Sequence, residues 1–359
     1  MKKIGIVTFH QALNYGAKLQ AYALQQFLEK NGIENDVIDY TCHFMYTKNI
    51  RPIRVGKHHK LKSFIRSLIT MRQVGIDRKK SVTFRNEFLN LSRPFDAKNI
   101  GEASNEYAAF IAGSDQVWSP ICVGFDTVYL LDFAKPKQKY SYAASFAVDK
   151  LPADKERTYK ELLSQFQLFS VREKSALNIV KKITGKNGVC HIDPTLLLNK
   201  DEWQKISVKK IDKPYILVFN VKPVKSLIDF AEKLSKKTGI PVVYITDNPQ
   251  KKRKNFTYVS APTVEEFLGY FANADYTVTN SFHGTAFSVI FHKNMFVEYE
   301  TAKGFNHRAK NLLQTIGINR EIKDGEAVTT DIDWNKVDNI LQAERKHSLD
   351  YLKDIIKGE

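Results

Sequence analysis

The sequence predicts an α/β protein with two similar halves. The chain opens with a strand, a loop, a helix and a second strand, and the same alternation resumes near residue 107. A new series of strands and helices begins near residue 213. Strands that alternate with helices form parallel sheets, which bind ligands at the carboxyl ends of their strands. We therefore expect the functional residues in loops that follow strands.

The first half is predicted from short apolar runs separated by helical patterns. Residues 4–8 form a buried strand, and apolar residues recur at helical spacing from Gly16 to Lys30, before Asn31-Gly32 ends the helix. Further strands are expected at 36–40, 107–113, 139–147, 167–171 and near Val189, with helices at 154–165 and 173–183. A long basic segment at about 42–95 interrupts this order, which indicates an insertion in an N-terminal domain of residues 1–195.

The second half, residues 196–359, repeats the alternation. The segment HIDPTLLLNKDEWQKI is predicted to cross irregularly between the halves, so we place the domain boundary in it. Strands are expected at 215–220, 241–246 and 275–279, with helices at 224–237, 263–273 and from His283. A final amphipathic helix, residues 337–356, could pack back across the first half.

The composition is that of an ordinary globular protein. Of 359 residues, 43% are apolar and 26% are charged, which excludes disorder and collagen. Cys42, Cys122 and Cys190 form no Cys-x-x-Cys pair, so they favour a reducing cytoplasm over a zinc cage or a disulfide framework. The N-terminus lacks the apolar core of a secretory signal, and no run of apolar residues is long enough to predict a membrane span.

The net charge is +16, which favours anionic partners. Residues 48–93 hold thirteen Lys or Arg against only Asp77 and Glu87. Within them, residues 58–76 interleave apolar and basic side chains, as an amphipathic helix at an anionic membrane surface does. A solvated basic face on a helix that packs against the protein core fits equally well. Nucleic acid is disfavoured, because no recognised nucleic-acid module accompanies the segment.

The strongest local signal is the run TVTNSFHGTAFSVIF, in which a β-rich stretch ends at Asn280 and an apolar helix begins. A helix N-terminus carries free N–H groups and partial positive charge, so those around Gly284, Thr285 and Ala286 are candidates to bind a phosphate or carboxylate. His283 at the same point can give or take a proton near neutral pH. The alternative is structural, with Ser281 as a helix cap and His283 as a hydrogen-bonded filler.

Two arginines are candidates to hold an anion. Arg172 follows a strand and precedes a helix in FSVREKSAL, and Arg308 lies near the start of another helix in GFNHRAKNLL. A guanidinium can bind a carboxylate or a phosphate through two parallel hydrogen bonds. The alternatives are a surface ion pair between Arg172 and Glu173 or a neighbour, and a solvent-facing position for Arg308.

Two loops complete the candidate site. The loop AGSDQVWSP places Ser114, Asp115 and Gln116 directly after a strand, where they could hydrogen-bond sugar hydroxyls, although small polar residues are common in any turn. Asn14 and Gly16 in the first loop resemble a phosphate-binding turn only loosely. Neither G-x-G-x-x-G nor G-x-x-x-x-G-K-[ST] is present, which disfavours a nicotinamide enzyme and a P-loop NTPase.

Several motifs occur in order along the chain: NYGAKLQAYALQ, AGSDQVW, SVRE, DPTLLL, and NSFHGTAF followed by NHR. Their order resembles the polysaccharide pyruvyl transferase family, from about Ile4 to about Leu313. The resemblance implies two Rossmann-like domains that face each other across a cleft, in a GT-B-like fold. It also implies transfer of a pyruvate ketal from phosphoenolpyruvate to two hydroxyls of a sugar in a cell-surface or exopolysaccharide precursor, with release of phosphate. No cofactor is expected beyond phosphoenolpyruvate as donor substrate, and no metal-ligand spacing is apparent.

Within this resemblance, His283 matches the family's catalytic histidine and Arg172 matches the arginine that holds the donor. Many members have Arg-Leu-His-Gly where this chain has Ser281-Phe282-His283-Gly284, so one donor-binding arginine is missing. Arg308 is a candidate to replace its charge. The remaining candidates for substrate binding are Asn280, Ser281, Gly284, Thr285, Asn14, Gly16, Ser114, Asp115 and Gln116.

These features predict a cytoplasmic transferase that acts on an anionic, lipid-linked glycan, with the basic insertion at the inner face of the plasma membrane. A GT-B-like glycosyltransferase is the first alternative, in which the helix at His283 would hold the diphosphate of a nucleotide sugar. The second alternative is a glycan-binding or membrane-binding relative without catalytic activity.

Overall fold

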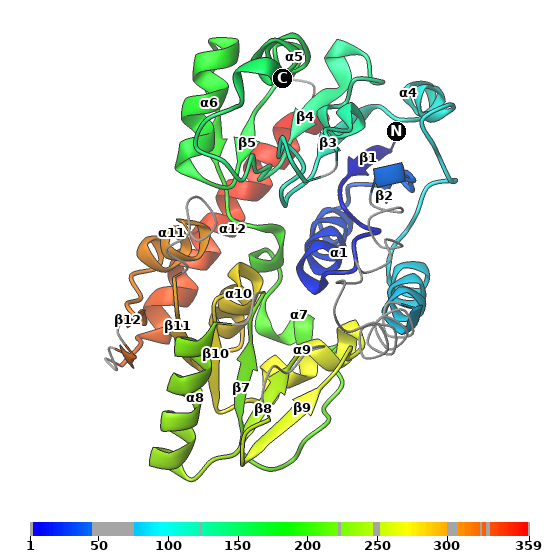
Figure 1. Ribbon diagram of the computed structural model, residues 1–359. Coiled ribbons are helices and arrows are strands. Elements are labelled where there is room, and N and C mark those ends of the chain that lie inside the picture. The colour runs from blue at the N-terminus through cyan, green and yellow to red at the C-terminus, as the bar shows by residue number, and fades with distance from the viewer. Residues whose placement is uncertain are drawn as a thin grey trace, which may run out of the picture.

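The computed structural model describes residues 3–44, 75–122, 124–221, 224–246, 252–299, 307–323, 325–327 and 331–357. Two parallel sheets, one in each half of the chain, lie in the upper and lower parts of Figure 1. Helices connect successive strands in both halves. The predicted α/β class with two similar halves is confirmed.

The first sheet has the order β2-β1-β3-β4, with parallel neighbours throughout. Its strands are β1 (Ile4–Val7), β2 (Asn35–Val37), β3 (Ala109–Ala112) and β4 (Lys139–Ser141). The pair β5 (Ser170–Val171) and β6 (Val189–Cys190) continues it through single bridges. The chain runs outward from β1 in one direction to β2 and in the other to β3. The gap between β1 and β3 is thus a topological switch point, where ligands bind in open α/β sheets.

The second sheet has the order β11-β10-β7-β8-β9, again all parallel. Its strands are β7 (Ile216–Phe219), β8 (Val242–Ile245), β9 (Phe256–Val259), β10 (Tyr276–Thr279) and β11 (Asn294–Val297). The direction of winding reverses between β7 and β10, which makes a second switch point. A separate hairpin joins β12 (Ile322–Lys323) to β13 (Glu326–Ala327).

The helices cover both sheets and the space between them (Figure 1). The first half contains η1 (Ile100–Glu102), α4 (Ala103–Glu106), η2 (Thr127–Leu130), η3 (Pro136–Gln138), α5 (Ala153–Leu163) and α6 (Lys174–Thr184). The crossing and the second half contain η4 (Pro194–Leu196), α7 (Lys200–Gln204), α8 (Lys225–Thr238), α9 (Val264–Asn273), α10 (Phe282–Ile290) and α11 (His307–Thr315).

Helix α1 (Tyr15–Lys30) joins the two halves. Asn14 caps it by accepting the N–H of Ala17 at 2.6 Å. Most of its residues are buried, because it packs beneath the first sheet on one side and against η4 and α9 on the other. At its start, the ring of Tyr15 stacks on Phe267 of α9 with centroids 4.3 Å apart. One continuous apolar cluster therefore runs through both halves.

Helix α12 (Trp334–Lys357) also connects the halves, and it is the red helix that rises across Figure 1. Arg345 donates to the carbonyl oxygen of Leu196 at 2.8 Å, and the Tyr351 hydroxyl donates to the carbonyl of Ser141 at the same distance. Its C-terminal part thus packs on the first half, while Val337 and Leu341 lie in the shared core.

Three sequence predictions need correction. The strand expected at 139–147 ends at Ser141, because Ala143 and Ala147 have φ angles of 48° and 57°, outside the extended region. The crossing segment expected to be irregular contains η4 and α7, each capped by the side chain that precedes it. Strands β9 and β11 were not predicted, since both are only four residues long and β9 is partly exposed.

The described part of the basic insertion packs against the core. Residues 75–88 are helical, and Phe84 is buried with its ring 6.2 Å from that of Tyr22. The amphipathic run predicted at 58–76 lies almost wholly outside the described residues. Among the helices that the structure describes, none is long and apolar enough to cross a membrane.

Candidate active site

The strand ends at the two switch points open into one cavity between the halves. Its volume is about 550 Å³, within the range of small-molecule sites. All four loops contribute: Asn14 and Gly16 follow β1, Asp115 and Gln116 follow β3, Asn220 follows β7, and Ser281 and His283 follow β10. The topology thus brings together residues more than 250 positions apart in the sequence.

His283 lies where the two halves touch. A Cβ atom placed on Gly16 would lie 2.0 Å from Nδ1 of His283, so the imidazole occupies space that only glycine leaves free. The Nε2 atom is 3.8 Å from Oδ2 of Asp193 and has no hydrogen-bond partner among the described residues. Burial lowers the pKa of His283, and the Asp193 charge opposes this. A neutral imidazole facing the cavity can accept a proton.

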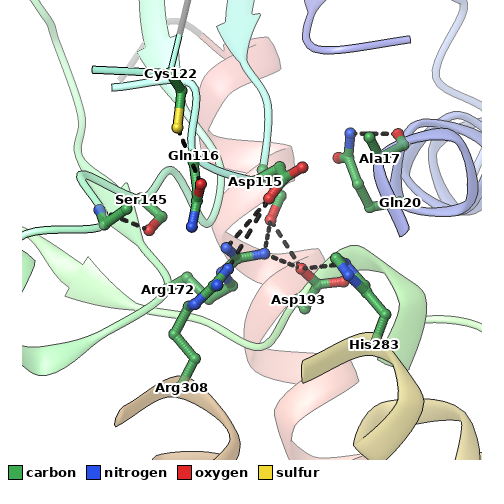
Figure 2. A network of polar contacts seen from close by, with 12 residues as sticks. Ala17, Gln20, Asp115, Gln116, Cys122, Ser145, Arg172, Asp193, His283 and Arg308 are labelled. Carbon is green, nitrogen blue, oxygen red and sulfur yellow. Dashed lines mark hydrogen bonds and ion pairs between the residues drawn. The ribbon is translucent and has the colours of Figure 1, made fainter. Parts of the chain in front are cut away.

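Arg172 is buried, with a side chain only 2% exposed, and it lies among three carboxylates, of which Figure 2 labels Asp115 and Asp193. Its Nη1 donates to Asp193 at 2.6 Å, and its other nitrogens are 3.5 Å from Asp115 and 4.0 Å from Glu173. Burial opposes the charged form, but these carboxylates raise the pKa of Arg172. The ion pair considered between Arg172 and Glu173 is thus present, but it is buried and not on the surface. Its Nε and Nη2 atoms have no hydrogen-bond partner in the described structure.

Arg308 approaches from α11 toward the same carboxylates, as Figure 2 shows. Its Nη1 is 4.0 Å from Asp115, and its guanidinium lies 5.6 Å from the centre of the Phe282 ring. The guanidinium carbon of Arg172 lies 4.8 Å from the centre of the same ring. Burial lowers the pKa of Arg308, and the charge of Arg172 adds to this. Both arginines also line a second cavity of about 270 Å³.

Asp193 organises the cluster, and no site role for it was predicted from the sequence. One oxygen accepts the N–H and hydroxyl of Thr195, which caps η4, and the other accepts Arg172 and Ser114. Burial opposes ionisation, but the positive charges of Arg172 and His283 outweigh it and lower the pKa of Asp193 to about 2. The Asp-Pro pair after a short strand indicates a cap, but it does not indicate which cations the carboxylate meets.

The β3 loop supplies both support and cavity surface. Ser114 is fully buried and its hydroxyl donates to Asp193, so it helps to fix the position of that carboxylate. Asp115 adopts a φ of 73°, which is rare outside glycine and is found at functional sites. Its carboxylate faces both arginines. Gln116 lines the cavity and accepts a hydrogen bond from the Cys122 thiol at 3.0 Å.

The start of α10 is closed by its own cap. Ser281 Oγ accepts the N–H of Gly284 at 3.2 Å, and the Ser281 carbonyl accepts the N–H of Thr285 at 2.9 Å. The N–H groups of Gly284 and Thr285 therefore have partners, and none of the three residues considered for an anion, Gly284, Thr285 and Ala286, lines the cavity. Asn280 turns toward β7, where its side-chain oxygen accepts the N–H of Val221 at 3.1 Å.

The sequence matches the polysaccharide pyruvyl transferase family over residues 14–298. The chain belongs to this family. Its members are transferases, so the chain is classed as one. No curated protein sequence matches it significantly.

The fold of this pyruvyl transferase family member is shared with solved structures. UDP-GlcNAc 2-epimerase from Neisseria meningitidis, solved with UDP-GlcNAc, aligns over 100% of this chain and 94% of that chain, with a TM-score of 0.50 and 10% identity. UGT89C1 from Arabidopsis thaliana, solved with UDP-L-rhamnose, aligns over 99% and 94%, with a TM-score of 0.47 and 10% identity. The likeness to the epimerase structure shows that the fold is GT-B-like, as expected.

The cavity of this family member brings together most of the predicted residues. His283, Arg308, Asp115, Gln116, Ser281, Asn14 and Gly16 line it, and Arg172 is one contact away through Asp115. No group of three or more His, Cys, Asp and Glu side chains in the described ranges could hold a metal ion.

Proposed function

We propose that the protein transfers a pyruvate ketal from phosphoenolpyruvate to two hydroxyls of a glycan acceptor. The observation that carries this proposal is the position of His283, which lines the cavity at the two switch points beside Arg308 and whose Nε2 makes no hydrogen bond to a described residue. Family membership supports the same reaction class.

The donor has a phosphate and a carboxylate, so it needs fixed hydrogen-bond donors with positive charge. Arg308 lines the cavity. Its guanidinium makes no hydrogen bond to a described residue, and its ion pair with Asp115 is 4.0 Å long. Among the described residues, the Nε and Nη2 atoms of Arg172 have no hydrogen-bond partner. Together they offer a bidentate guanidinium to each end of the donor.

Arg308 also takes the place of the arginine that many family members carry two positions before the histidine. In this chain Ser281 stands there and acts as the helix cap. Arg308 reaches the site from α11 and lies over Phe282, the residue between Ser281 and His283. We propose that it supplies the missing charge from this neighbouring helix.

The reaction requires proton transfer in both directions. One acceptor hydroxyl attacks C2 of phosphoenolpyruvate while C3 gains a proton, and the second hydroxyl then replaces the phosphate at C2. The two hydroxyl protons balance the proton added at C3 and the proton carried away by phosphate. His283 is the group that takes a proton from an attacking hydroxyl and returns one, and Asp193 at 3.8 Å stabilises its charged form.

We further propose that the acceptor is a lipid-linked precursor of a cell-surface glycan or exopolysaccharide, and that the reaction takes place in the cytoplasm. The support is the basic segment 48–93, whose charge suits an anionic membrane surface. A sedimentation assay with vesicles of neutral or anionic lipid tests this part, because we expect binding only to the anionic vesicles, with loss at high salt.

The reaction itself is tested with phosphoenolpyruvate labelled in its pyruvyl carbons and the glycan fraction of the cells that make the protein. We expect label in the glycan with equal release of phosphate, and a loss of at least 100-fold in His283→Asn. His292→Asn is the matched control, because His292 bonds to Asp338 and does not line the cavity.

Other outcomes assign the protein to another class. Binding of uridine diphosphate without phosphoenolpyruvate would favour a glycosyltransferase that uses a nucleotide sugar. Binding of glycan with no turnover of any donor would leave a non-catalytic relative.

A further inference from the structure

Lys18 is a cation that the protein buries without neutralising. It lies on α1, only 3% of the residue is exposed, and it lines the 550 Å³ cavity. Within the described ranges its ammonium has no hydrogen bond and no carboxylate within ion-pair distance, and it lies 5.6 Å from the centre of the Tyr15 ring. A buried charge without a partner is costly, so it is rarely kept without a role.

Two further donors line the same cavity. Lys80, in the helical stretch 75–88 of the insertion, donates to the carbonyl of Ala261 at 2.5 Å and keeps two N–H bonds for a ligand. Asn220 at the end of β7 accepts from Tyr244 through its oxygen, while its Nδ2 is buried with no partner among the described residues. The three donors come from three separate elements and line one space.

Acidic groups near Lys18 do not neutralise it. Asp77 lines the cavity one turn before Lys80, and Glu265 lies in the first turn of α9. Neither carboxylate lies within 4 Å of the Lys18 ammonium, although their charges act on it. Burial lowers the pKa of Lys18 to about 8, which is what an unpaired buried ammonium shows. The arginines, in contrast, already face Asp115 and Asp193.

We propose that Lys18, with Lys80 and Asn220, binds a negatively charged group carried by the glycan acceptor itself, a phosphate or a carboxylate on the sugar. This rests on the proposed function, in which donor and acceptor occupy the cavity together. A neutral sugar would leave the Lys18 ammonium buried and unpaired, so the cavity selects acidic or phosphorylated glycans. The insertion thereby contributes to acceptor choice through Lys80.

The test uses three probes of similar size in the presence of saturating phosphoenolpyruvate: glucose 1-phosphate, glucuronate and glucose. Isothermal titration should give binding of at least one anionic sugar and none of glucose. Lys18→Met should weaken that binding at least tenfold, Lys18→Arg should restore part of it, and Lys80→Met should weaken it less. Lys30→Met is the matched control on the same helix, since Lys30 is exposed and pairs with Glu202 outside this cavity.

The proposal is overturned if neither anionic sugar binds, if glucose binds equally well, or if Lys18→Met leaves the affinity unchanged. It is also overturned if Lys18→Met weakens phosphoenolpyruvate as much as the sugar, because Lys18 would then belong to the donor. Failure of the wild-type protein to bind phosphoenolpyruvate at all is a separate result, which contradicts the proposed function. The sugar titrations are then carried out without phosphoenolpyruvate. Circular dichroism confirms that each variant is folded.

Discussion

Arg172 and Lys18 are both cations buried at the cavity between the halves, but they differ in what surrounds them. Arg172 lies among Asp193, Asp115 and Glu173, and these carboxylates raise its pKa against the effect of burial. Lys18 has no such partner in the described structure, and burial lowers its pKa to about 8. The first charge is compensated by the fold, and the second is left for a ligand.

This difference separates a cation that also holds the site together, Arg172, from a cation that we propose only binds substrate, Lys18. The carboxylates around Arg172 fix its position. Arg172 in turn holds Asp193, which lies 3.8 Å from His283. Removing Arg172 should therefore damage the structure. Removing Lys18 should relieve a cost to folding and damage only binding.

The largest effect is expected for Arg172→Ala. Asp193 has a fully buried side chain, and without Arg172 its charge would be uncompensated, so the free energy of unfolding should fall by about 3–5 kcal/mol. Urea denaturation at pH 7 measures this. Arg157→Ala, which removes an exposed arginine paired with Glu161 on its own helix, should change little. Equal stability of the two variants would show that the carboxylate cluster does not depend on Arg172.

Lys18→Met should have the opposite sign. A pKa of about 8 against the ordinary 10.5 corresponds to a folding cost of about 3 kcal/mol. Below pH 8 the lysine is charged in both folded and unfolded chains, so the variant should be more stable by up to that amount. Between pH 8 and 10.5 only the unfolded chain binds the proton, so the advantage should shrink as pH rises. Denaturation at pH 7 and pH 9.5 checks this, and a variant less stable than wild type at pH 7 would contradict it.

Gly16→Ala tests the contact between the halves. The added methyl would overlap the imidazole of His283, and relief of such overpacking costs about 1–3 kcal/mol. We expect transferase activity to fall more steeply than stability, because the imidazole that we propose to be catalytic must move. Gly101→Ala is a suitable control, since a Cβ at Gly101 meets no atom within 4 Å. Full activity in Gly16→Ala would show that the position of the ring is not important.

Ser281→Ala should have the smallest effect. Loss of the cap on α10 should lower the free energy of unfolding by about 1 kcal/mol. Because the N–H of Gly284 already bonds to Ser281, we expect the affinity for phosphoenolpyruvate to change less than threefold. A tenfold loss measured by titration would instead support an anion site at this helix N-terminus.

The sequence was sufficient to predict a parallel sheet in each half, and the strand ends at which His283, Arg172 and Asp115 lie. These follow from local patterns, since a buried strand followed by polar residues and a helix places those residues at one edge of a sheet. The order of the motifs also identified the family, which the match over residues 14–298 confirms.

Long-range contacts could not be predicted in the same way. That Gly16 leaves space for His283, or that Asp193 joins Arg172, depends on how the two halves pack, and no local pattern encodes it. Lys18 was read only as part of a helix with apolar spacing, and its burial results from α1 lying between both halves. Strand β11 was not predicted for a similar reason. It has only four residues, and it is recognised as a strand by its pairing with β10.

Thermal unfolding with phosphoenolpyruvate or uridine diphosphate tests the central claim most directly. At 100 times its Kd, a ligand stabilises the folded protein by about 2.7 kcal/mol. We predict that phosphoenolpyruvate raises the Tm of the wild-type protein, that this rise is lost in Arg308→Ala, and that uridine diphosphate has no effect. Stabilisation by uridine diphosphate alone, or an equal response to phosphoenolpyruvate in Arg308→Ala, would contradict the assignment of this cavity to pyruvyl transfer.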